Sequence, residues 1–123
     1  MRALAGVTAR DDVWGLPVFV IGEFLRVVTH PSILRPPSTL EIAVESIDAL
    51  VGRPNSVVLN PGPRFWELLR TTTIQNRAQG NLAADAQIVA VCREHGVDEI
   101  LTEDRDFTRF DGIRVRTLSD FAP

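Results

Sequence analysis

The sequence predicts an α/β fold, a parallel sheet with helices packed on its faces, and two features indicate it. Short β-branched runs alternate along the chain with longer segments of helical periodicity, and strands separated by helices usually pair in parallel. No repeat, low-complexity tract or linker divides the 123 residues, a length that suits one hydrophobic core. We therefore expect residues 1–123 to form a single domain.

Two helices are predicted in the first half of the chain from their end signals. Pro17 suits the first turn of a helix, and residues 18–29 continue with helical periodicity until Pro31 restricts the backbone before it. Ser38-Thr39 is placed to cap a second helix, whose apolar positions continue as far as Gly52.

Two more helices are predicted in the second half. Pro63 can open a helix that ends near Gly80. Residues 82–95 are again helical in pattern, and they stop at Gly96, where a left-handed helix cap is common.

Three strands are predicted, and the N-terminus is the unusual part of the chain. Short apolar runs bounded by turns occupy residues 56–59, 98–102 and 113–118, and the first of them should be buried. Residues 1–9 have the pattern of the end of an amphipathic helix, with Asp11-Asp12 in a loop and no strand before them. We therefore expect the fold to be N-terminally incomplete, without its usual first strand.

Composition excludes several classes of protein. The single cysteine, Cys92, cannot form an internal disulfide, and no signal peptide is evident, so a cytoplasmic location is expected. The longest early apolar stretch, residues 16–25, is too short and too interrupted to cross a membrane. The formal net charge is −3, so any polyanion must be held by local features of the surface. All 13 basic residues are arginine, a bias that fits phosphate binding and equally fits a GC-rich genome.

Asp85 is an acid in an apolar helix face. At helical spacing it shares its side with Leu82, Ile88, Val89 and Cys92, the residues expected to face the core. A buried carboxylate is costly unless it pairs with an arginine, takes up a proton or binds a metal ion.

Glu23 shows the same pattern. Phe19, Val20 and Val27 surround it at helical spacing, which predicts a second acid pointing inward. The alternative is an ion pair, for which Arg26 lies three residues away.

Asp104 and Asp106 follow the strand predicted over residues 98–102. Ligands in α/β proteins bind beyond the carboxyl ends of strands, although a D-x-D pair also occurs on ordinary solvated turns. Four acids without histidine or cysteine companions would select Mg²⁺ or Mn²⁺ over zinc. His30 and His95 are expected at helix ends, outside such a site.

Two other kinds of site find little support. No phosphate-binding glycine loop or serine nucleophile motif is present, which disfavours a phosphatase or another small-molecule Mg²⁺ enzyme. Trp14 and Trp66 could stack on nucleic-acid bases, but packing in the core or an interface is the expected role.

Three motifs, in this order and spacing, resemble the PIN-domain family, in particular the VapC toxins of bacterial toxin–antitoxin pairs. They are residues 23–31 (EFLRVVTHP), residues 81–86 (NLAADA) and residues 101–107 (LTEDRDF), with Arg109-Phe110 close behind. The resemblance implies a PIN-like three-layer sandwich with a central parallel sheet flanked by helices.

The resemblance also implies site residues. Glu23, Asp85 and Asp104 match the core metal-binding acids of the family, Asp106 matches a frequent additional acid, and Thr102 matches the hydroxyl residue that supports them. The first core acid of the family, at the end of an N-terminal strand, has no match here.

The activity implied is that of a metal-dependent endoribonuclease, in which a water activated by Mg²⁺ or Mn²⁺ hydrolyses RNA. It would be the toxin of a type II toxin–antitoxin pair, with RNA as substrate, a VapB-type antitoxin as partner, a homodimer as the assembly and no membrane. The alternative is a catalytically deficient PIN remnant that acts only as a binding or dimerisation module.

Overall fold

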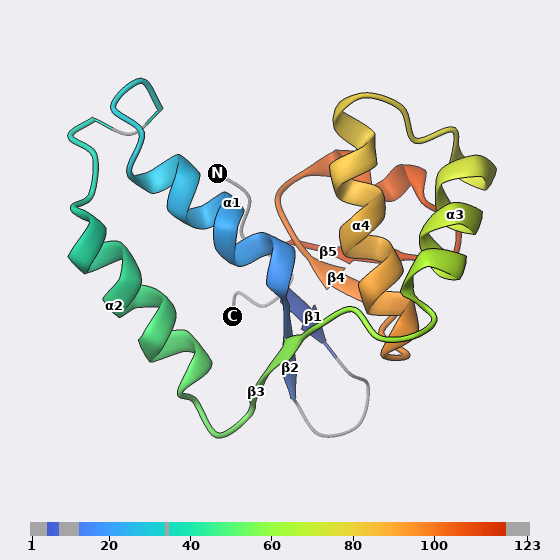
Figure 1. Ribbon diagram of the computed structural model, residues 1–123, viewed down its shortest axis with the longest axis horizontal. Coiled ribbons are helices and arrows are strands. Elements are labelled where there is room, and N and C mark those ends of the chain that lie inside the picture. The colour runs from blue at the N-terminus through green and yellow to red at the C-terminus, as the bar shows by residue number, and fades with distance from the viewer. Residues whose placement is uncertain (1–4, 8–12, 34, 118–123) are drawn as a thin grey trace.

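A computed structural model describes residues 5–7, 13–33 and 35–117 as strands and helices around one sheet (Figure 1). In chain order the elements are β1 (Ala5–Val7), β2 (Trp14–Pro17), α1 (Val18–Val28), α2 (Leu40–Val51), β3 (Ser56–Leu59), α3 (Phe65–Asn76), α4 (Asn81–Glu94), β4 (Glu99–Leu101), the 3₁₀ helix η1 (Arg105–Arg109) and β5 (Arg114–Arg116). This alternation of strands and helices confirms the predicted α/β class.

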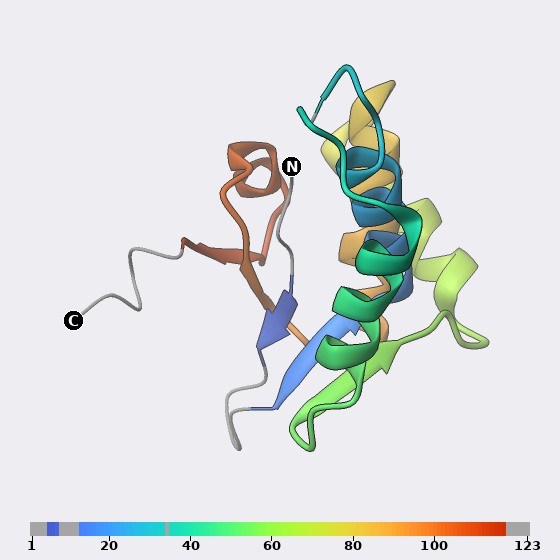
Figure 2. The same ribbon diagram turned by 90° about the vertical axis from the view of Figure 1, so that its left-hand side faces the viewer.

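The five strands form one sheet in the order β3-β2-β1-β4-β5. The pairs β2·β3 and β4·β5 are parallel, as predicted, whereas β1 runs antiparallel to both of its neighbours in the centre. Figure 1 shows α1 and α2 on the left of the molecule and α3 and α4 on the right. Figure 2 shows β5 and η1 on the side opposite α2 and α3.

The expectation that no strand lies near the N-terminus is wrong. Residues 5–7 form β1 and not the end of a helix, and Gly6 pairs with both Gly15 and Ile100. The backbone groups of β2 and β4 that face each other would otherwise lack hydrogen-bond partners, and this requirement outweighs the weak helical pattern. Asp11 and Asp12 lie outside the described residues.

The four predicted helices are confirmed, and their end signals act largely as expected. The Thr39 hydroxyl accepts a hydrogen bond from the Ile42 amide at 3.2 Å and so caps α2. Gly96 has a φ of 72°, which few other residues adopt easily, and it follows the end of α4. Helix α3 ends earlier than predicted, at Asn76, because Arg77 takes the left-handed cap position.

The strand over residues 56–59 is less buried than predicted. It is an edge strand, and Val57 is 50% exposed while Leu59 is buried. Helix α2 leaves much of its own apolar surface in solvent, and Ala43 is its one fully buried residue. No helix in the described ranges is long and apolar enough to span a membrane.

Helix α4 lies in the centre of the core. It is buried almost continuously between Asp85 and Cys92, and it packs against α3, β2 and η1. The Arg93 guanidinium donates to the Thr72 hydroxyl at 2.8 Å and to the Asp111 carbonyl, which ties α4 to α3 and to the segment after η1. Asn76 reinforces this link by accepting a hydrogen bond from the Asp111 amide at 3.1 Å.

Removal of the Phe107 side chain should destabilise the protein strongly. Phe107 is completely buried in η1 between α4 and the sheet, so Phe107→Ala leaves a cavity that costs about 3–5 kcal/mol. Chemical denaturation measures the loss, with Trp66→Ala on the exposed face of α3 as the control, expected to change stability by about 0.5 kcal/mol or less. Equal losses in the two variants would contradict this core assignment.

Candidate metal centre

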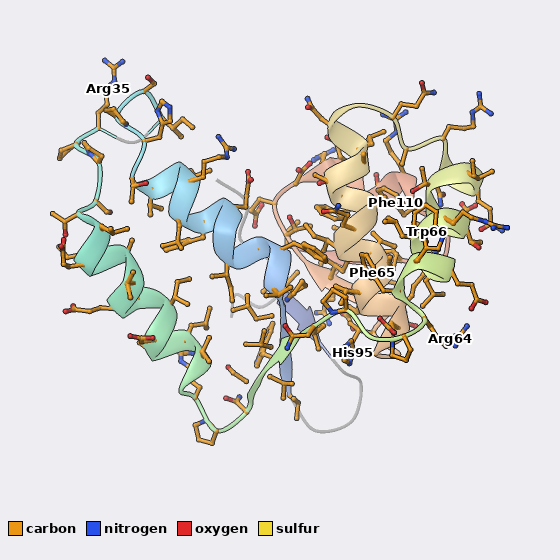
Figure 3. The ribbon with its side chains drawn as sticks, viewed as in Figure 1. Arg35, Arg64, Phe65, Trp66, His95 and Phe110 are labelled. Atoms are coloured by element: carbon orange, nitrogen blue, oxygen red, sulfur yellow. The ribbon has the colours of Figure 1, made fainter. Side chains whose placement is uncertain are left out.

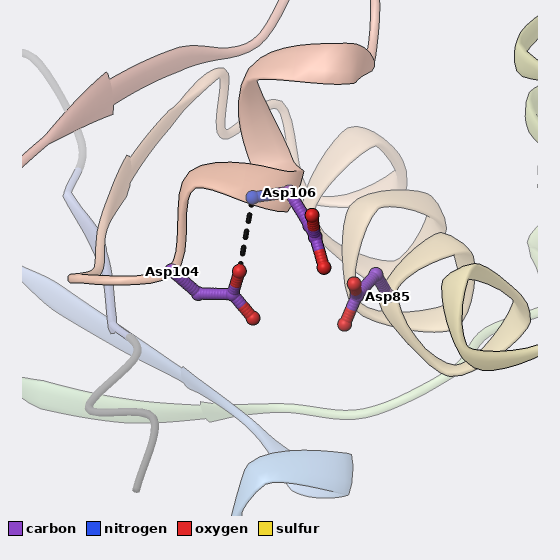
Figure 4. A group of neighbouring side chains, drawn as sticks. All are labelled: Asp85, Asp104 and Asp106. Atoms are coloured by element: carbon purple, nitrogen blue, oxygen red, sulfur yellow. Dashed lines mark hydrogen bonds between the residues drawn. The ribbon is translucent and has the colours of Figure 1, made fainter.

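Three carboxylates from separate parts of the chain come together on one side of α4 (Figure 4). Asp85, Asp104 and Asp106 each offer an oxygen atom, and these atoms all lie within 4.8 Å of one another. Within the described ranges, no other set of three or more acidic, histidine or cysteine side chains meets in this way.

Asp85 is fixed by the packing of its helix. It lies in the first half of α4 and is completely buried, together with Ile88, Val89 and Cys92 on the same face. The predicted inward direction of Asp85 is therefore confirmed. Because its neighbours are inflexible core side chains, the carboxylate has little freedom to leave the cluster.

Asp104 and Asp106 are fixed by a short series of hydrogen bonds after β4. The buried Thr102 hydroxyl accepts from the Asp104 amide at 3.0 Å. The Asp104 carboxylate in turn accepts from the Asp106 amide at 2.9 Å and caps η1, as Figure 4 shows. The backbone thus turns immediately after the strand and directs both aspartates toward Asp85.

Glu23 lies outside this group of three. Its carboxylate forms an ion pair with Arg26, with 2.8 Å between Oε1 and Nη2, and its side chain is 35% exposed. This hydrogen bond raises the pKa of the Arg26 guanidinium above its ordinary value. The ion pair that the sequence left open as an alternative is therefore present.

The histidines take structural positions, as predicted. His30 Nδ1 accepts a hydrogen bond from the Ser32 amide just after α1. His95 Nε2 lies 2.9 Å from the Asn60 carbonyl oxygen at the end of α4. Neither imidazole belongs to the group of three aspartates.

The donor set fits a hard divalent cation. The three carboxylates place like charges close together, with oxygen atoms within 4.8 Å of one another. A cation between them would reverse the sign of this interaction, and oxygen-only donors suit Mg²⁺ or Mn²⁺. Asp85, Asp104 and Asp106 would hold such an ion.

Comparison with known proteins agrees with this geometry. The sequence pattern of the PIN domain matches residues 2–113. The chain belongs to the PIN-domain family. Among its relatives, Ribonuclease VapC48 of Mycobacterium tuberculosis (strain ATCC 25618 / H37Rv) is 42% identical over 93 residues, which cover 76% of this chain and 64% of the relative.

Two further relatives extend the match to more of the chain. VapC ribonuclease Mb2897 of Mycobacterium bovis is 36% identical over 106 residues, which cover 86% of this chain and 71% of the relative. Ribonuclease VapC31 of M. tuberculosis is 35% identical over 106 residues, with 74% of the relative covered. The chain thus spans less than two thirds of the VapC48 protein and somewhat more of the other two.

Substitution of Asp85 should weaken metal binding. Asp85→Asn removes one charged ligand without a change of shape, and we expect Mn²⁺ affinity to fall about tenfold or more, or about 1.4 kcal/mol. Isothermal titration calorimetry measures the change, with Asp48→Asn on the exposed surface of α2 as the control. Unchanged binding by Asp85→Asn would show that this carboxylate holds no ion.

Substitution of Asp104 should not destabilise the metal-free protein. Asparagine retains the oxygen that caps η1 but removes one of three neighbouring charges, so Asp104→Asn should unfold at the same temperature as the unchanged protein or at a higher one in EDTA. Thermal denaturation tests this, and added Mn²⁺ should stabilise the unchanged chain more than the variant. A large loss of stability in EDTA would instead show that Asp104 is a structural partner.

Proposed function

We propose that the protein is a metal-dependent endoribonuclease that hydrolyses RNA phosphodiesters. The observation that carries this proposal is the convergence of Asp85, Asp104 and Asp106, with oxygen atoms within 4.8 Å of one another, beyond the carboxyl end of β4. The names of the relatives VapC48, Mb2897 and VapC31, each called a ribonuclease, support it.

The three aspartates would have different roles in the site because they differ in exposure. Asp85 is completely buried and Asp104 is half-buried, so they form the fixed inner wall of the site. Asp106 is exposed, and it marks the side from which an RNA phosphate can approach. A bound Mg²⁺ or Mn²⁺ would supply Lewis acidity, which activates a water and neutralises charge on the phosphate oxygens.

Glu23 is proposed as a fourth ligand because it matches the family motif. Its carboxylate is engaged with Arg26, so a ligand role requires this exposed ion pair to open. Exposed ion pairs contribute little to stability, about 0–1 kcal/mol, and a divalent ion can compete with one. Release of Arg26 would also leave a guanidinium beside the site for a phosphate oxygen.

The proposed biological role is the toxin of a type II toxin–antitoxin pair in the cytoplasm. A VapB-type antitoxin would be the partner, and the toxin would act as a homodimer. The exposed apolar side chains of α2 support a protein partner, since 61% of Leu40, 56% of Ile42 and 43% of Val44 is accessible to solvent.

A second candidate is a binding module without catalysis. Residues Ala5–Val7 occupy the centre of the sheet without contributing an acid, so the first core acid of the family remains unmatched in the described strands. Such a module would keep the fold and the partner surface but hold its metal ion weakly.

Metal-dependent RNA cleavage distinguishes the two candidates. The unchanged chain should cleave a structured RNA with Mg²⁺ or Mn²⁺ and lose this activity in EDTA. Asp104→Asn should reduce the rate of cleavage at least about a hundredfold, because loss of an outer partner of a metal ligand alone costs about 10–100-fold. Asp48→Asn should cleave at the rate of the unchanged chain. Cleavage that survives Asp104→Asn would contradict the proposed site, and absence of cleavage by the unchanged chain would favour the binding module.

A further inference from the structure

One face of α3 carries a row of large exposed side chains. Trp66, Arg70 and Ile74 are spaced four residues apart and therefore lie along one side of the helix. Arg77, the cap residue after the last turn, lines a hollow together with Ile74 and completes the row. Trp66 is 66% exposed and Ile74 is 70% exposed. Of the two roles expected for Trp66, packing in the core is therefore wrong, and packing in an interface stays a prediction.

The inward and outward faces of α3 are distinct. Phe65 turns toward α1, where its ring centre lies 5.7 Å from that of Phe19. Trp66 is the next residue, about 100° further round the helix, and it presents its ring to solvent (Figure 3). The indole is therefore available for contact with a ligand.

A groove runs beside this row. A hollow of about 230 Å³ lies between α3 and α4, and most of its wall is apolar. It is lined by Trp66, Leu69, Arg70, Thr73 and Ile74 on α3 and by Ala83 and Gln87 on α4. A second hollow of about 280 Å³ shares Thr73 and Ile74 with the first and extends to Arg77. Each is smaller than the 300–1,000 Å³ pockets that hold drug-sized ligands, and so suits a single flat ring.

The two arginines of this row differ from the arginine at the start of α3 in their ion pairing. Within the described residues neither Arg70 nor Arg77 forms an ion pair, whereas Arg64, at the start of the same helix, lies 3.8 Å from Glu67. Arg77 also has a φ of 51°, in the left-handed region that glycine or asparagine adopts more easily. An arginine there gives up favourable backbone geometry and provides a second positive charge on this face.

We propose that this face of α3 binds single-stranded RNA, with a base stacked on Trp66 and phosphates contacted by Arg70 and Arg77. Sequence-tolerant binding of single strands combines an aromatic ring with neighbouring cations in this way. The identity of the ligand as RNA rests on the proposed function. Ala83 and Gln87 line the groove while Asp85, between them, faces the acidic cluster, so α4 separates the two sites by about one helix diameter of 10 Å.

A second copy of the chain fits this face less well. In a two-fold dimer a surface patch meets itself, so Arg70 and Arg77 of both copies would approach each other, and the acid of α3, Glu67, already lies 3.8 Å from Arg64. Like charges brought together oppose association, whereas a polyanion is attracted by them. The charge of this row therefore favours RNA.

Binding in EDTA separates this site from catalysis. Fluorescence anisotropy of a labelled, unstructured RNA of about 12 nucleotides would give the affinity of the full chain without cleavage. Trp66→Ala should weaken binding about fivefold or more, while Trp66→Phe, which can still stack, should bind nearly as the unchanged chain does. A duplex of the same sequence should bind more weakly, because its bases are already stacked.

The arginines are tested by salt dependence. Arg70→Gln and Arg77→Asn should each reduce the slope of log affinity against log salt by about 0.7, the effect of one phosphate contact on a single strand. Arg77→Asn keeps a residue suited to the left-handed position, so weaker binding cannot be attributed to a misfolded helix end. Arg53→Gln, at an exposed position between α2 and β3, is the matched control and should leave the slope unchanged.

The outcomes decide the inference independently of the nuclease proposal. Unchanged RNA affinity in Trp66→Ala, Arg70→Gln and Arg77→Asn would overturn it. So would loss of a dimer in Trp66→Ala, measured by light scattering, with RNA binding intact, since this would assign the face to a second copy. RNA binding that depends on these residues in a chain that fails to cleave would support the inference and reject the nuclease. Cleavage that is lost in Asp104→Asn but unaffected by the substitutions of Trp66, Arg70 and Arg77 would support the nuclease and reject the inference.

Discussion

The close approach of three aspartate carboxylates determines how the elements around them must be held. The carboxylates of Asp85, Asp104 and Asp106 lie within 4.8 Å of one another because the surrounding fold brings their backbones together. The buried face of α4 fixes the first, and the hydrogen bonds that run from Thr102 through Asp104 to the Asp106 amide fix the other two. A cation bound here would offset the like charge of the carboxylates and stabilise the folded chain.

The scaffold of the site is the half of the molecule built from α3, α4 and η1. Arg93 joins these elements by reaching both Thr72 and the Asp111 carbonyl, and Asn76 holds the same segment through the Asp111 amide. The outer surface of this scaffold carries the row formed by Trp66, Arg70, Ile74 and Arg77, so the two helices that bury Asp85 on one side offer a groove on the other. A single pair of helices thereby serves both the acidic cluster and the proposed RNA contact.

The local parts of the fold were predictable from sequence, whereas the non-local parts were not. Caps and periodicity mark α1 to α4 because these signals lie within each helix, and the same periodicity turns Asp85 inward. Strand β1 was not predicted, because a run as short as Ala5–Val7 carries little local signal. Its strand conformation depends on hydrogen bonds to β2 and β4 on either side. Glu23 and Trp66 show a second limit, since helical spacing cannot tell whether an inward acid will meet Arg26 or whether a neighbouring element covers an aromatic ring.

Anomalous X-ray diffraction from crystals grown with Mn²⁺ would locate the ion itself. We expect one strong anomalous peak among Asp85, Asp104 and Asp106, with carboxylate oxygens at about 2.1 Å and water molecules in the remaining positions. The same map would show whether Glu23 has left Arg26 to join the ion. An ion bound elsewhere, or three aspartates with no peak between them at saturating Mn²⁺, would contradict the assignment of this cluster as a metal centre.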